Sequence, residues 1–324
     1  MRVGIDVSPL RQTRAGTARY LCGLLPHLER LVDVEQLAFG GAGRFAAAAR
    51  DAVWYPVALG RRTRGLEVLH CPTFRAPLRS SVPLVVTVHD LAVLRHPQTF
   101  NRWTRTYSSV FVPRVVRAAQ RVIAVSEFTK RELIDVLSLP EARIRVVPNA
   151  VAEPFVAEGA RADGEYVLAV GTLEPRKNLP RLAAAARNAG VELRVAGAPG
   201  WGGVQVGGDG VRFLGFVPDE ELARLYRGSL CVAYPSLYEG FGIPVLEALA
   251  CGAPVVTSAG SAMAEIADGA AVLVDPRDGD AIAEGIREAI RRREELAVLG
   301  PKRARAFSWQ ASAEATAAVY REVA

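Results

Sequence analysis

Short apolar runs alternate along this chain with longer stretches in which apolar residues recur at helical spacing. The runs are rich in valine, isoleucine and leucine, as in Leu84 to Val88 and Tyr166 to Val170. Strands this uniformly apolar are typical of parallel sheets whose two faces are both covered by the connecting helices. The sequence therefore predicts an α/β fold.

The expected strands form two sets, one in each half of the chain. The first set consists of Val3 to Val7, Gln36 to Phe39, Val68 to Cys71, Leu84 to Val88, Arg121 to Val125 and Arg145 to Val147. The second set consists of Tyr166 to Val170, Glu192 to Ala196, Val211 to Leu214, Leu230 to Ala233, Pro254 to Thr257 and Ala271 to Val274. Helical periods indicate helices at Ala15 to Leu31, Arg102 to Ala119, Glu127 to Val136, Leu179 to Asn188 and Asp219 to Tyr226.

The stretch Pro148 to Gly164 separates the two sets. It has two prolines, two glycines and no sustained period, which indicates a linker. A chain of 324 residues suits two domains that each bury a core of their own. We therefore expect two doubly wound, Rossmann-like domains, residues 1–155 and 160–307, that face one another across a cleft. The tail, residues 308–324, has helical spacing and is expected to pack back on one domain, the N-terminal one by preference.

Composition and charge restrict the class of protein. The chain is 50% hydrophobic and 23% charged, which is typical of a folded globular protein. Its net charge of +6 suits an anionic substrate or membrane surface, and because no nucleic-acid-binding motif occurs, no nucleic acid partner is expected. The isolated cysteines indicate a reducing compartment: Cys22, Cys71, Cys231 and Cys251. Without a signal peptide or a spanning run, a cytoplasmic protein is expected, at most associated with the cytoplasmic face of a membrane.

A glycine turn with two adjacent cations follows the expected strand Tyr166 to Val170. It runs from Gly171 to Asn178 and contains Arg176 and Lys177. Glycine lets the backbone approach a ligand closely, Asn178 is placed to cap the next helix, and the cations can neutralise a diphosphate. Adjacent basic residues also occur in solvated turns, so the pair alone leaves that alternative open.

A glycine-rich segment with two glutamates follows the expected strand Leu230 to Ala233. It runs from Glu239 to Glu247, and Pro244 favours a helix that begins inside it. Backbone N–H groups at that helix start would form a phosphate seat, and each carboxylate could accept two hydrogen bonds from a vicinal diol. The alternatives are a surface-loop role for Glu239 and a helix-start role for Glu247.

Both segments resemble motifs of the family-four retaining glycosyltransferases, which have the GT-B fold. Further matches are Gly16 to Tyr20, His89 with Asp90, Val147 to Ala150, and Gly215 to Val217 ahead of an acidic helix. The resemblance covers nearly the whole chain. It implies an enzyme that takes a sugar from a nucleotide diphosphate donor held by its C-terminal half.

The resemblance implies roles at the donor site residue by residue. Arg176 and Lys177 would bind the diphosphate and stabilise the departing nucleotide. Glu247 would hold the ribose, and Glu239 would hold the hydroxyls of the transferred sugar. The other expected donor-binding residues are Gly16 and Thr17, in a loop over the diphosphate, and Gly171, Glu174, Phe241, Gly242 and Ile243.

The expected acceptor-binding residues are His89, Asp90 and Tyr20, and His89 joins Arg176, Lys177 and Glu239 as an expected catalytic residue. His89 follows a strand, where functional groups of parallel sheets collect. It could accept a hydrogen bond from the sugar or relay the acceptor proton. A lone histidine after a strand can also be a structural hydrogen-bonding residue.

The donor sugar and the acceptor are less determined. Thr87 to Pro97 and Gly197 to Trp201 look most like family members that use GDP-mannose in surface polysaccharide assembly, with UDP- and dTDP-sugars as alternatives. The acceptor would be a glycan, a lipid-linked molecule or a small molecule. Two rival functions are a nucleotide-sugar epimerase on the same fold and a non-catalytic nucleotide-sugar-binding module.

Three further patterns have alternative explanations. Asp278 and Asp280 look like metal-binding aspartates, but capping by Asp280 of a helix that begins near Ala281 explains them, so neither a metal nor a cofactor is expected. Gly41 to Gly43 mimics a dinucleotide fingerprint but follows the second strand rather than the first. Arg102 to Arg121 mixes aromatic residues with five arginines and is either an amphipathic face for lipid headgroups or an ordinary crossover helix.

Overall fold

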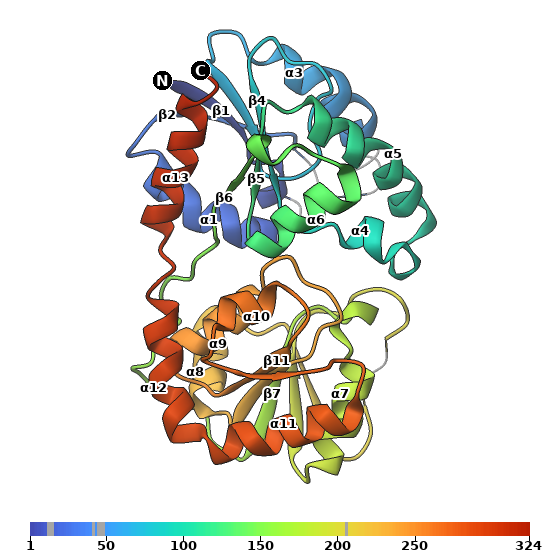
Figure 1. Cartoon of the computed structure of the whole chain (residues 1–324), viewed down its shortest axis with the longest axis vertical. Helices are drawn as coiled ribbons and strands as arrows, with labels where there is room; N and C mark the ends of the chain where they lie inside the picture. The colour runs from blue at the N-terminus through green and yellow to red at the C-terminus, as the bar shows by residue number, and fades with distance from the viewer. Residues whose placement is uncertain (12–15, 41–42, 44–48, 205–206) are drawn as a thin grey trace. The chain divides into compact units, whose positions relative to one another are not determined.

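The computed structural model describes residues 1–11, 16–40, 43, 49–204 and 207–324, so Gly41 and Ala42 of the dinucleotide-like segment lie outside the described residues. The chain divides into two compact units (Figure 1). Unit 1 comprises Met1–Pro97, Asn101–Ala150 and Ser308–Ala324, and unit 2 comprises Gln98–Phe100 and Val151–Phe307. All residues from Pro148 to Gly164 are described, and none belongs to a helix or strand.

Unit 1 is built on a six-stranded parallel sheet in the order β2-β1-β3-β4-β5-β6. Its strands are β1 (Arg2–Asp6), β2 (Asp33–Leu37), β3 (Val68–Cys71), β4 (Leu84–Val88), β5 (Arg121–Ala124) and β6 (Ile144–Val146). The strand order reverses at β1, which pairs with β2 on one side and β3 on the other. Ligands of such sheets bind outside the carboxyl ends of the strands at this kind of switch point.

The helical segments that surround this sheet come from both ends of the chain. They are η1 (Ser8–Arg11), α1 (Gly16–Leu28), η2 (Arg50–Ala58), α3 (Leu59–Arg61), α4 (Ala92–Arg95), η3 (Pro97–Thr99), α5 (Arg102–Ala118), α6 (Glu127–Leu137), η4 (Glu141–Arg143) and α13 (Trp309–Arg321). No helix among the described residues is both long enough and apolar enough to cross a membrane.

Helix α13, at the far end of the chain, belongs to unit 1 and packs beside α1 (Figure 1). The contact is close, because a Cβ atom added at Gly23 on α1 would lie 2.1 Å from the Trp309 ring. Ser308 caps α13 by accepting a hydrogen bond from Ala311 N, and Ser312 Oγ donates to Pro148 O at 2.6 Å. The tail is thus fixed to unit 1 by packing and by polar contacts.

Unit 2 is a second six-stranded parallel sheet in the order β12-β11-β10-β7-β8-β9. Its strands are β7 (Tyr166–Val170), β8 (Glu192–Ala196), β9 (Val211–Gly215), β10 (Cys231–Tyr234), β11 (Val255–Ser258) and β12 (Val272–Val274). Its helical segments are η5 (Pro175–Lys177), α7 (Leu179–Asn188), α8 (Asp219–Gly228), α9 (Ile243–Ala250), α10 (Ala262–Ala267), α11 (Gly279–Arg291) and α12 (Arg293–Ala304). The order is that of a doubly wound Rossmann sheet, with its switch point between β7 and β10.

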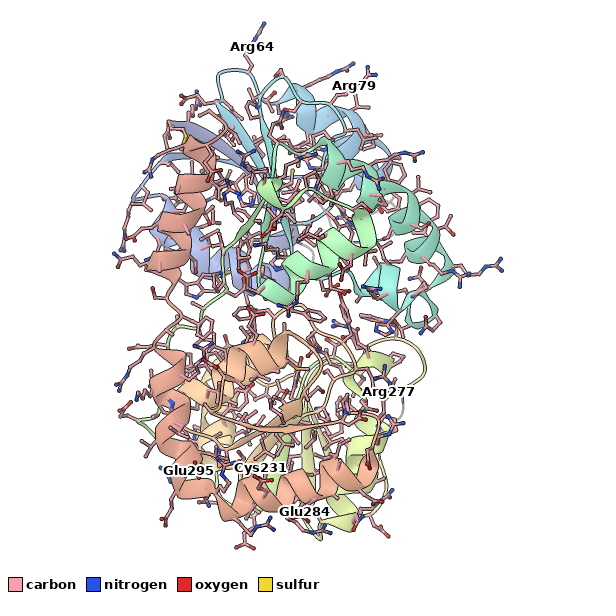
Figure 2. The ribbon with its side chains drawn as sticks, in the orientation of Figure 1. Arg64, Arg79, Cys231, Arg277, Glu284 and Glu295 are labelled. Atoms are coloured by element: carbon pink, nitrogen blue, oxygen red, sulfur yellow. The ribbon has the colours of Figure 1, made fainter. Side chains whose placement is uncertain are left out.

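The core of unit 2 lies where α7 and α11 cover one face of the sheet. Leu182 on α7 and Ile286 on α11 are completely buried in it, together with Cys231 on β10 (Figure 2). Helix α11 approaches the sheet so closely that a Cβ atom at Gly285 would lie 2.5 Å from a Val274 methyl group. The four cysteines of the chain are free thiols, and three of them are buried.

The segment that enters unit 2 is held by an arginine that the sequence patterns did not single out. Arg227 on α8 is buried, and its guanidinium donates to Ala160 O at 2.8 Å, Val156 O at 3.1 Å and Pro154 O at 3.3 Å. These bonds satisfy carbonyl groups that have no strand or helix partner. The chain after Ala150 is therefore part of the folded body of unit 2.

The cap predicted for α11 is wrong by two residues. The helix begins at Gly279, and the Asp278 side chain caps it by accepting from Asp280 N at 2.9 Å and Ala281 N at 3.1 Å. Asp280 instead accepts a hydrogen bond from Asn188 Nδ2 at 3.2 Å. Either aspartate satisfies the composition rule for a cap, and only the first helical residue decides between them.

Candidate functional site

Two loops meet at the switch point of the unit 2 sheet. Strands β7 and β10 are neighbours, with Val167 opposite Cys231 and Leu168 opposite Val232. The loop after β7 begins at Gly171, and the loop after β10 leads through Glu239 to α9. Parallel pairing therefore brings the two motifs predicted to bind the donor to the same edge of one sheet.

Asn178 connects the two loops from inside the protein. Its side-chain amide donates to Pro235 O at 3.1 Å and to Pro276 O at 2.6 Å, and its Oδ1 accepts from Arg181 Nη1 at 2.6 Å. The residue is in the left-handed region, at φ 60°, and its side chain makes no cap bond to α7. The prediction that Asn178 caps the helix is therefore wrong, because its amide is used to fasten the loops.

The same loops are joined by charged side chains. Glu239 Oε2 accepts from Arg176 Nη1 at 2.9 Å, and Glu239 Oε1 accepts from Lys177 Nζ at 2.6 Å. Arg176 also lies 2.9 Å from Glu174 Oε1 and donates to Tyr238 O at 3.1 Å. All four charged side chains are at most 15% exposed. The structure thus brings together four of the residues predicted to bind the donor.

The electrostatics of this charged cluster favour the ionised forms. Burial alone would raise the pKa of Glu239, but the charges of Arg176 and Lys177 outweigh it and lower that pKa to about 2. Burial opposes the charge of Lys177, yet the Glu239 carboxylate keeps the pKa of Lys177 above its usual value. Burial prevails at Glu174 and raises the pKa of that carboxyl, although Arg176 opposes the shift.

Tyr234, at the end of β10, is part of this cluster and was missed in the sequence. Its hydroxyl accepts a hydrogen bond from Lys177 Nζ and donates to Glu239 Oε1 at 3.2 Å. The Lys177 ammonium also lies 4.7 Å from the centre of the Tyr234 ring. Burial, followed by the Glu239 charge, raises the pKa of Tyr234 to about 12. The only sequence signal was its position at the carboxyl end of a central strand.

Glycine is required where the first loop crosses the end of β8. A Cβ atom at Gly197 would lie 1.9 Å from Gly171 O, and one at Gly200 would lie 2.2 Å from Leu173 O. Gly171 has a φ of 139°, and a Cβ atom there would lie 3.3 Å from Lys177 Cε. Glycines therefore let three backbone segments and the Lys177 side chain share one small space.

The second loop places the remaining residues predicted for donor binding around the start of α9. Gly242 precedes this helix at φ 102°, a conformation that favours glycine, and Ile243 is its first residue. Phe241 is buried edge-on against Phe307, with ring centroids 5.9 Å apart. Glu247 is only 1% exposed, and its Oε2 accepts from Tyr226 Oη at 2.9 Å. Glu247 is thus anchored within the fold, one turn after the helix start.

In unit 1, His89 follows β4 and is held by a backbone carbonyl group. His89 Nε2 lies 3.0 Å from Pro72 O. Since a carbonyl oxygen only accepts, Nε2 carries the hydrogen and Nδ1 is the acceptor nitrogen. Burial lowers the pKa of His89, against a smaller opposite effect of Asp90. The imidazole is therefore neutral near pH 7 and can accept a hydrogen bond from a hydroxyl group.

Tyr20 supports His89 from inside unit 1. The two rings meet edge to face with centroids 4.9 Å apart, and Tyr20 is completely buried. Its hydroxyl lies 3.3 Å from Thr87 Oγ1, which is 2.8 Å from His70 Nε2, while His70 Nδ1 lies 2.6 Å from Tyr320 Oη on α13. The burial of Tyr20 does not fit the expectation that this residue contacts the acceptor directly.

The other residues predicted in unit 1 lie at helix starts. Asp90 Oδ1 accepts from Ala92 N at 2.9 Å, at the beginning of α4. Gly16 and Thr17 are the first two residues of α1, and Gly16 is exposed. The residues directly before them, 12–15, lie outside the described part of the chain, so the predicted loop is described only at its helical end.

Comparisons with known proteins agree with this architecture. Residues 14–153 match the family described as Glycosyltransferase Family 4, and residues 152–306 match the family described as Glycosyl transferases group 1. The chain is 31% identical to O-antigen chain mannosyltransferase B of Escherichia coli over 284 residues, which cover 78% of this chain and 74% of that protein.

Two further comparisons extend this result. The chain is 32% identical to D-inositol 3-phosphate glycosyltransferase of Geodermatophilus obscurus, over 76% of this chain and 62% of that protein, so it spans less than two thirds of this relative. The structure of a sucrose-phosphate synthase from Thermosynechococcus elongatus is similar with a TM-score of 0.77 at 19% identity, covering 99% of this chain and 98% of that one. The chain therefore belongs to the family-four, group 1 glycosyltransferases, and its two parallel sheets are the Rossmann-like domains of the GT-B fold.

Proposed function

We propose that this glycosyltransferase moves a hexose, mannose from GDP-mannose by preference, to a hydroxyl group of a glycan or lipid-linked acceptor, with retention at the anomeric carbon. The name of the Escherichia coli relative supports mannose as the sugar. The observation that carries the donor site is the pair of buried cations, Arg176 and Lys177, that share the Glu239 carboxylate at the sheet switch point.

The cations are positioned before any donor binds. Hydrogen bonds between the two loops, from Asn178 to Pro235 O and from Leu237 N to Arg176 O, fix the backbone that carries Arg176 and Lys177. Charges that are already oriented need little reorganisation when negative charge develops on a leaving diphosphate. In the bound state the diphosphate would replace much of the Glu239 carboxylate as the partner of both cations, and Glu239 would turn to the hydroxyls of the sugar.

The rest of the donor would lie along the two loops. Gly171 and Gly242 let the backbone come close to the phosphates, and the N–H groups near Phe241 and Ile243 add the positive end of α9. Glu174 would keep Arg176 in place, and Glu247 would hold the ribose. Gly16 and Thr17 would contribute from the start of α1.

The reaction we propose breaks the bond between the anomeric carbon and the β-phosphate oxygen. The acceptor oxygen forms its new bond on the same face of the sugar, and the acceptor proton passes to the departing phosphate oxygen. Arg176 and Lys177 stabilise the charge on that oxygen without the help of a metal. Glu239 is unsuited to a role as base, because a pKa of about 2 makes it a weak proton acceptor.

His89 would act by hydrogen bonding in this scheme. Its pKa is lowered by burial, so the ring is neutral at working pH and presents Nδ1 as an acceptor to a sugar or acceptor hydroxyl. Asp90 and Tyr20 would then contribute indirectly, through the start of α4 and the edge of the His89 ring.

Transfer from labelled GDP-mannose, compared with UDP-glucose and dTDP-rhamnose, tests the donor. Lys177→Ala should lower the rate about a hundredfold, because one lost charge contact costs about 3 kcal/mol of transition-state stabilisation. Lys302→Ala, at an exposed lysine on α12 of the same unit, should leave the rate unchanged. Equal losses in both variants would contradict the proposed site.

Product analysis separates the rival functions. Incubation with the donor alone would yield an epimer if the chain were an epimerase, and a non-catalytic module would show neither transfer nor donor hydrolysis. Proton NMR of the product linkage should show the anomeric configuration of the donor. An inverted linkage, or a glycosyl adduct trapped on any side chain, would exclude same-face transfer.

A further inference from the structure

Exposed apolar side chains gather on one part of unit 1. Among the described residues, seven large apolar side chains of unit 1 are exposed, and five of them come from η2, from the loop after β3, and from α5. They are Val53 (54% exposed), Val57 (43%), Leu78 (39%), Trp103 (68%) and Val110 (39%).

Contacts within unit 1 place these segments next to one another. The Asp51 carboxylate on η2 and the Arg75 guanidinium, which lie 3.5 Å apart, both shift the pKa of Tyr107 on α5, after the larger upward effect of burial. A Cβ atom at Gly60 would lie 2.6 Å from Arg79 O, so the segment after η2 packs against the loop that carries Leu78. We call this surface the η2–α5 face, formed by Val53, Val57, Leu78, Trp103 and Val110.

Helix α5 has apolar residues on two sides. Val112, Val115 and Val116 are buried against unit 1, as expected for a crossover helix. Trp103, Tyr107 and Phe111, spaced four residues apart, stack along another side with centroid distances of 6.2 and 4.4 Å. Burial of one side therefore explains the valines but leaves the exposed Trp103 and Val110 without a covering element among the described residues.

The charge around this face is strongly one-sided. Residues 52–126 contain eleven arginines and only two acidic residues, Glu67 and Asp90, a net charge of +9 in a chain whose total is +6. No acidic residue occurs between Leu91 and Ser126. Exposed arginines lie beside the apolar residues, and Figure 2 shows two of them, Arg64 and Arg79, pointing away from unit 1; the others are Arg61, Arg102 and Arg114.

We propose that the η2–α5 face docks on a lipid bilayer that contains anionic lipids. Trp103 and the valines would enter the interfacial layer, where tryptophan is favoured, and the arginines would contact headgroup phosphates. Exposed apolar side chains within a basic rim match this surface better than nucleic acid, which would leave Val53, Val57 and Val110 without a partner. Docking does not depend on the identity of the sugar or on the proposed donor site.

Vesicle flotation tests this interaction. The full chain should float with vesicles of equimolar phosphatidylcholine and phosphatidylglycerol, bind much less to phosphatidylcholine alone, and dissociate as salt is raised. The double variant Arg102→Glu, Arg114→Glu should bind at least about thirtyfold more weakly, since each arginine at an anionic surface contributes about 1 kcal/mol. The double variant Trp103→Ser, Val110→Ser should bind weakly at every salt concentration.

A matched control comes from unit 2. Val298 is 70% exposed and Arg212 is exposed, so the double variant Val298→Ser, Arg212→Glu changes the same chemistry outside the η2–α5 face and should float like the unchanged protein. All changed side chains are exposed, and circular dichroism should show an unchanged fold.

Tryptophan fluorescence locates the contact. Lipids brominated in their acyl chains should quench emission of the bound protein, and Trp103→Phe should lose most of this quenching. Trp201→Phe, at the exposed tryptophan of unit 2, should retain it. Failure to float with anionic vesicles, or quenching that persists without Trp103, would overturn the proposal. So would a dimer in sedimentation analysis that Trp103→Ser dissociates, because a second copy would then cover the face.

Discussion

At the scale of single residues, Glu239 compensates much of the charge of two cations before any ligand binds. Its oxygens lie 2.6 Å from Lys177 Nζ and 2.9 Å from Arg176 Nη1. Glu239→Gln should therefore raise the affinity for free guanosine diphosphate about tenfold, a change of about 1.4 kcal/mol. Sugar transfer should fall, because a neutral amide binds the sugar hydroxyls less strongly than a carboxylate. Calorimetric titration and initial rates measure the two effects.

Glu192 provides the comparison for this prediction. It pairs with Arg194 in the same unit, at 3.1 Å, on β8. Glu192→Gln should change neither the affinity for guanosine diphosphate nor the transfer rate. Weaker nucleotide binding by Glu239→Gln would show that the carboxylate assists the diphosphate instead of occupying its place.

The Tyr234 hydroxyl links Lys177 to Glu239, whereas its ring supports the ammonium from below. Tyr234→Phe keeps the ring and removes the link, so we expect kcat to fall about tenfold, in line with the loss of a charged hydrogen bond. Tyr166→Phe removes a hydroxyl that donates to Leu225 O at 2.8 Å, and should lower stability without changing kcat. Unaltered turnover in Tyr234→Phe would assign that hydroxyl a purely structural role.

At the scale of elements, the contact between α1 and α13 depends on the absence of a side chain at position 23. A Cβ atom there would lie within 2.5 Å of three atoms of the buried Trp309 ring. Gly23→Ala should therefore destabilise the protein by about 1 to 3 kcal/mol, despite the higher helix propensity of alanine. Gly16→Ala, in the same helix but without a neighbour within 4 Å, should be neutral in thermal denaturation. Similar melting temperatures of the two variants would refute the close packing.

The hydrogen bonds of His70 connect α13 to the sheet of unit 1 and make its stability depend on pH. Burial, with a smaller effect of His89, lowers the pKa of His70 to about 3. The unfolded chain, with a pKa of 6.5, binds the proton more readily, so stability is complete above pH 6.5 and is lost as pH falls toward 3. The slope should be about 1.4 kcal/mol per pH unit for this group.

Replacement of His70 tests this linkage. His70→Gln should cost stability at pH 7, because Tyr320 and Thr87 lose a buried partner. It should also make the pH dependence shallower, leaving the contribution of His89, whose pKa is lowered as well. Urea unfolding between pH 4 and 7 measures both effects, and an unchanged slope would contradict the assignment to His70.

The strands were predictable because their signal is local. β3, β4, β7 and β8 have the expected bounds, since apolar runs between polar residues determine where a buried strand begins and ends. Helix η2 was not predicted, because Arg50 to Ala58 contains a proline and no sustained apolar period. The cap at Asp278 was missed because two aspartates compete for one position.

The site was predictable only where its residues lie in one motif. Arg176, Lys177 and Glu239 were recognised, since each follows a strand and has the chemistry of a phosphate or sugar ligand. Tyr234 could not be, because its role depends on a lysine 57 residues away. The contact between His70 and Tyr320, 250 residues apart, exists only once α13 has returned to unit 1.

At the scale of the whole molecule, two units of similar internal connectivity each contain a complete sheet and a core of their own. Each unit has a different lever on its stability. The donor should act on unit 2, through Arg176, Lys177 and Glu239, whereas acid should act on unit 1, through His70.

Differential scanning calorimetry can therefore separate the two units. A nucleoside diphosphate at about a hundred times its Kd stabilises the unit that binds it by about 2.7 kcal/mol, which raises the melting temperature of a domain of this size by about 5 to 10 °C. We expect guanosine diphosphate to shift the transition of unit 2, and His70→Gln to lower that of unit 1 alone. Lys177→Ala should abolish the first shift and leave the second effect intact. If guanosine diphosphate and His70→Gln instead moved one common transition by comparable amounts, the two units would unfold as a single cooperative body.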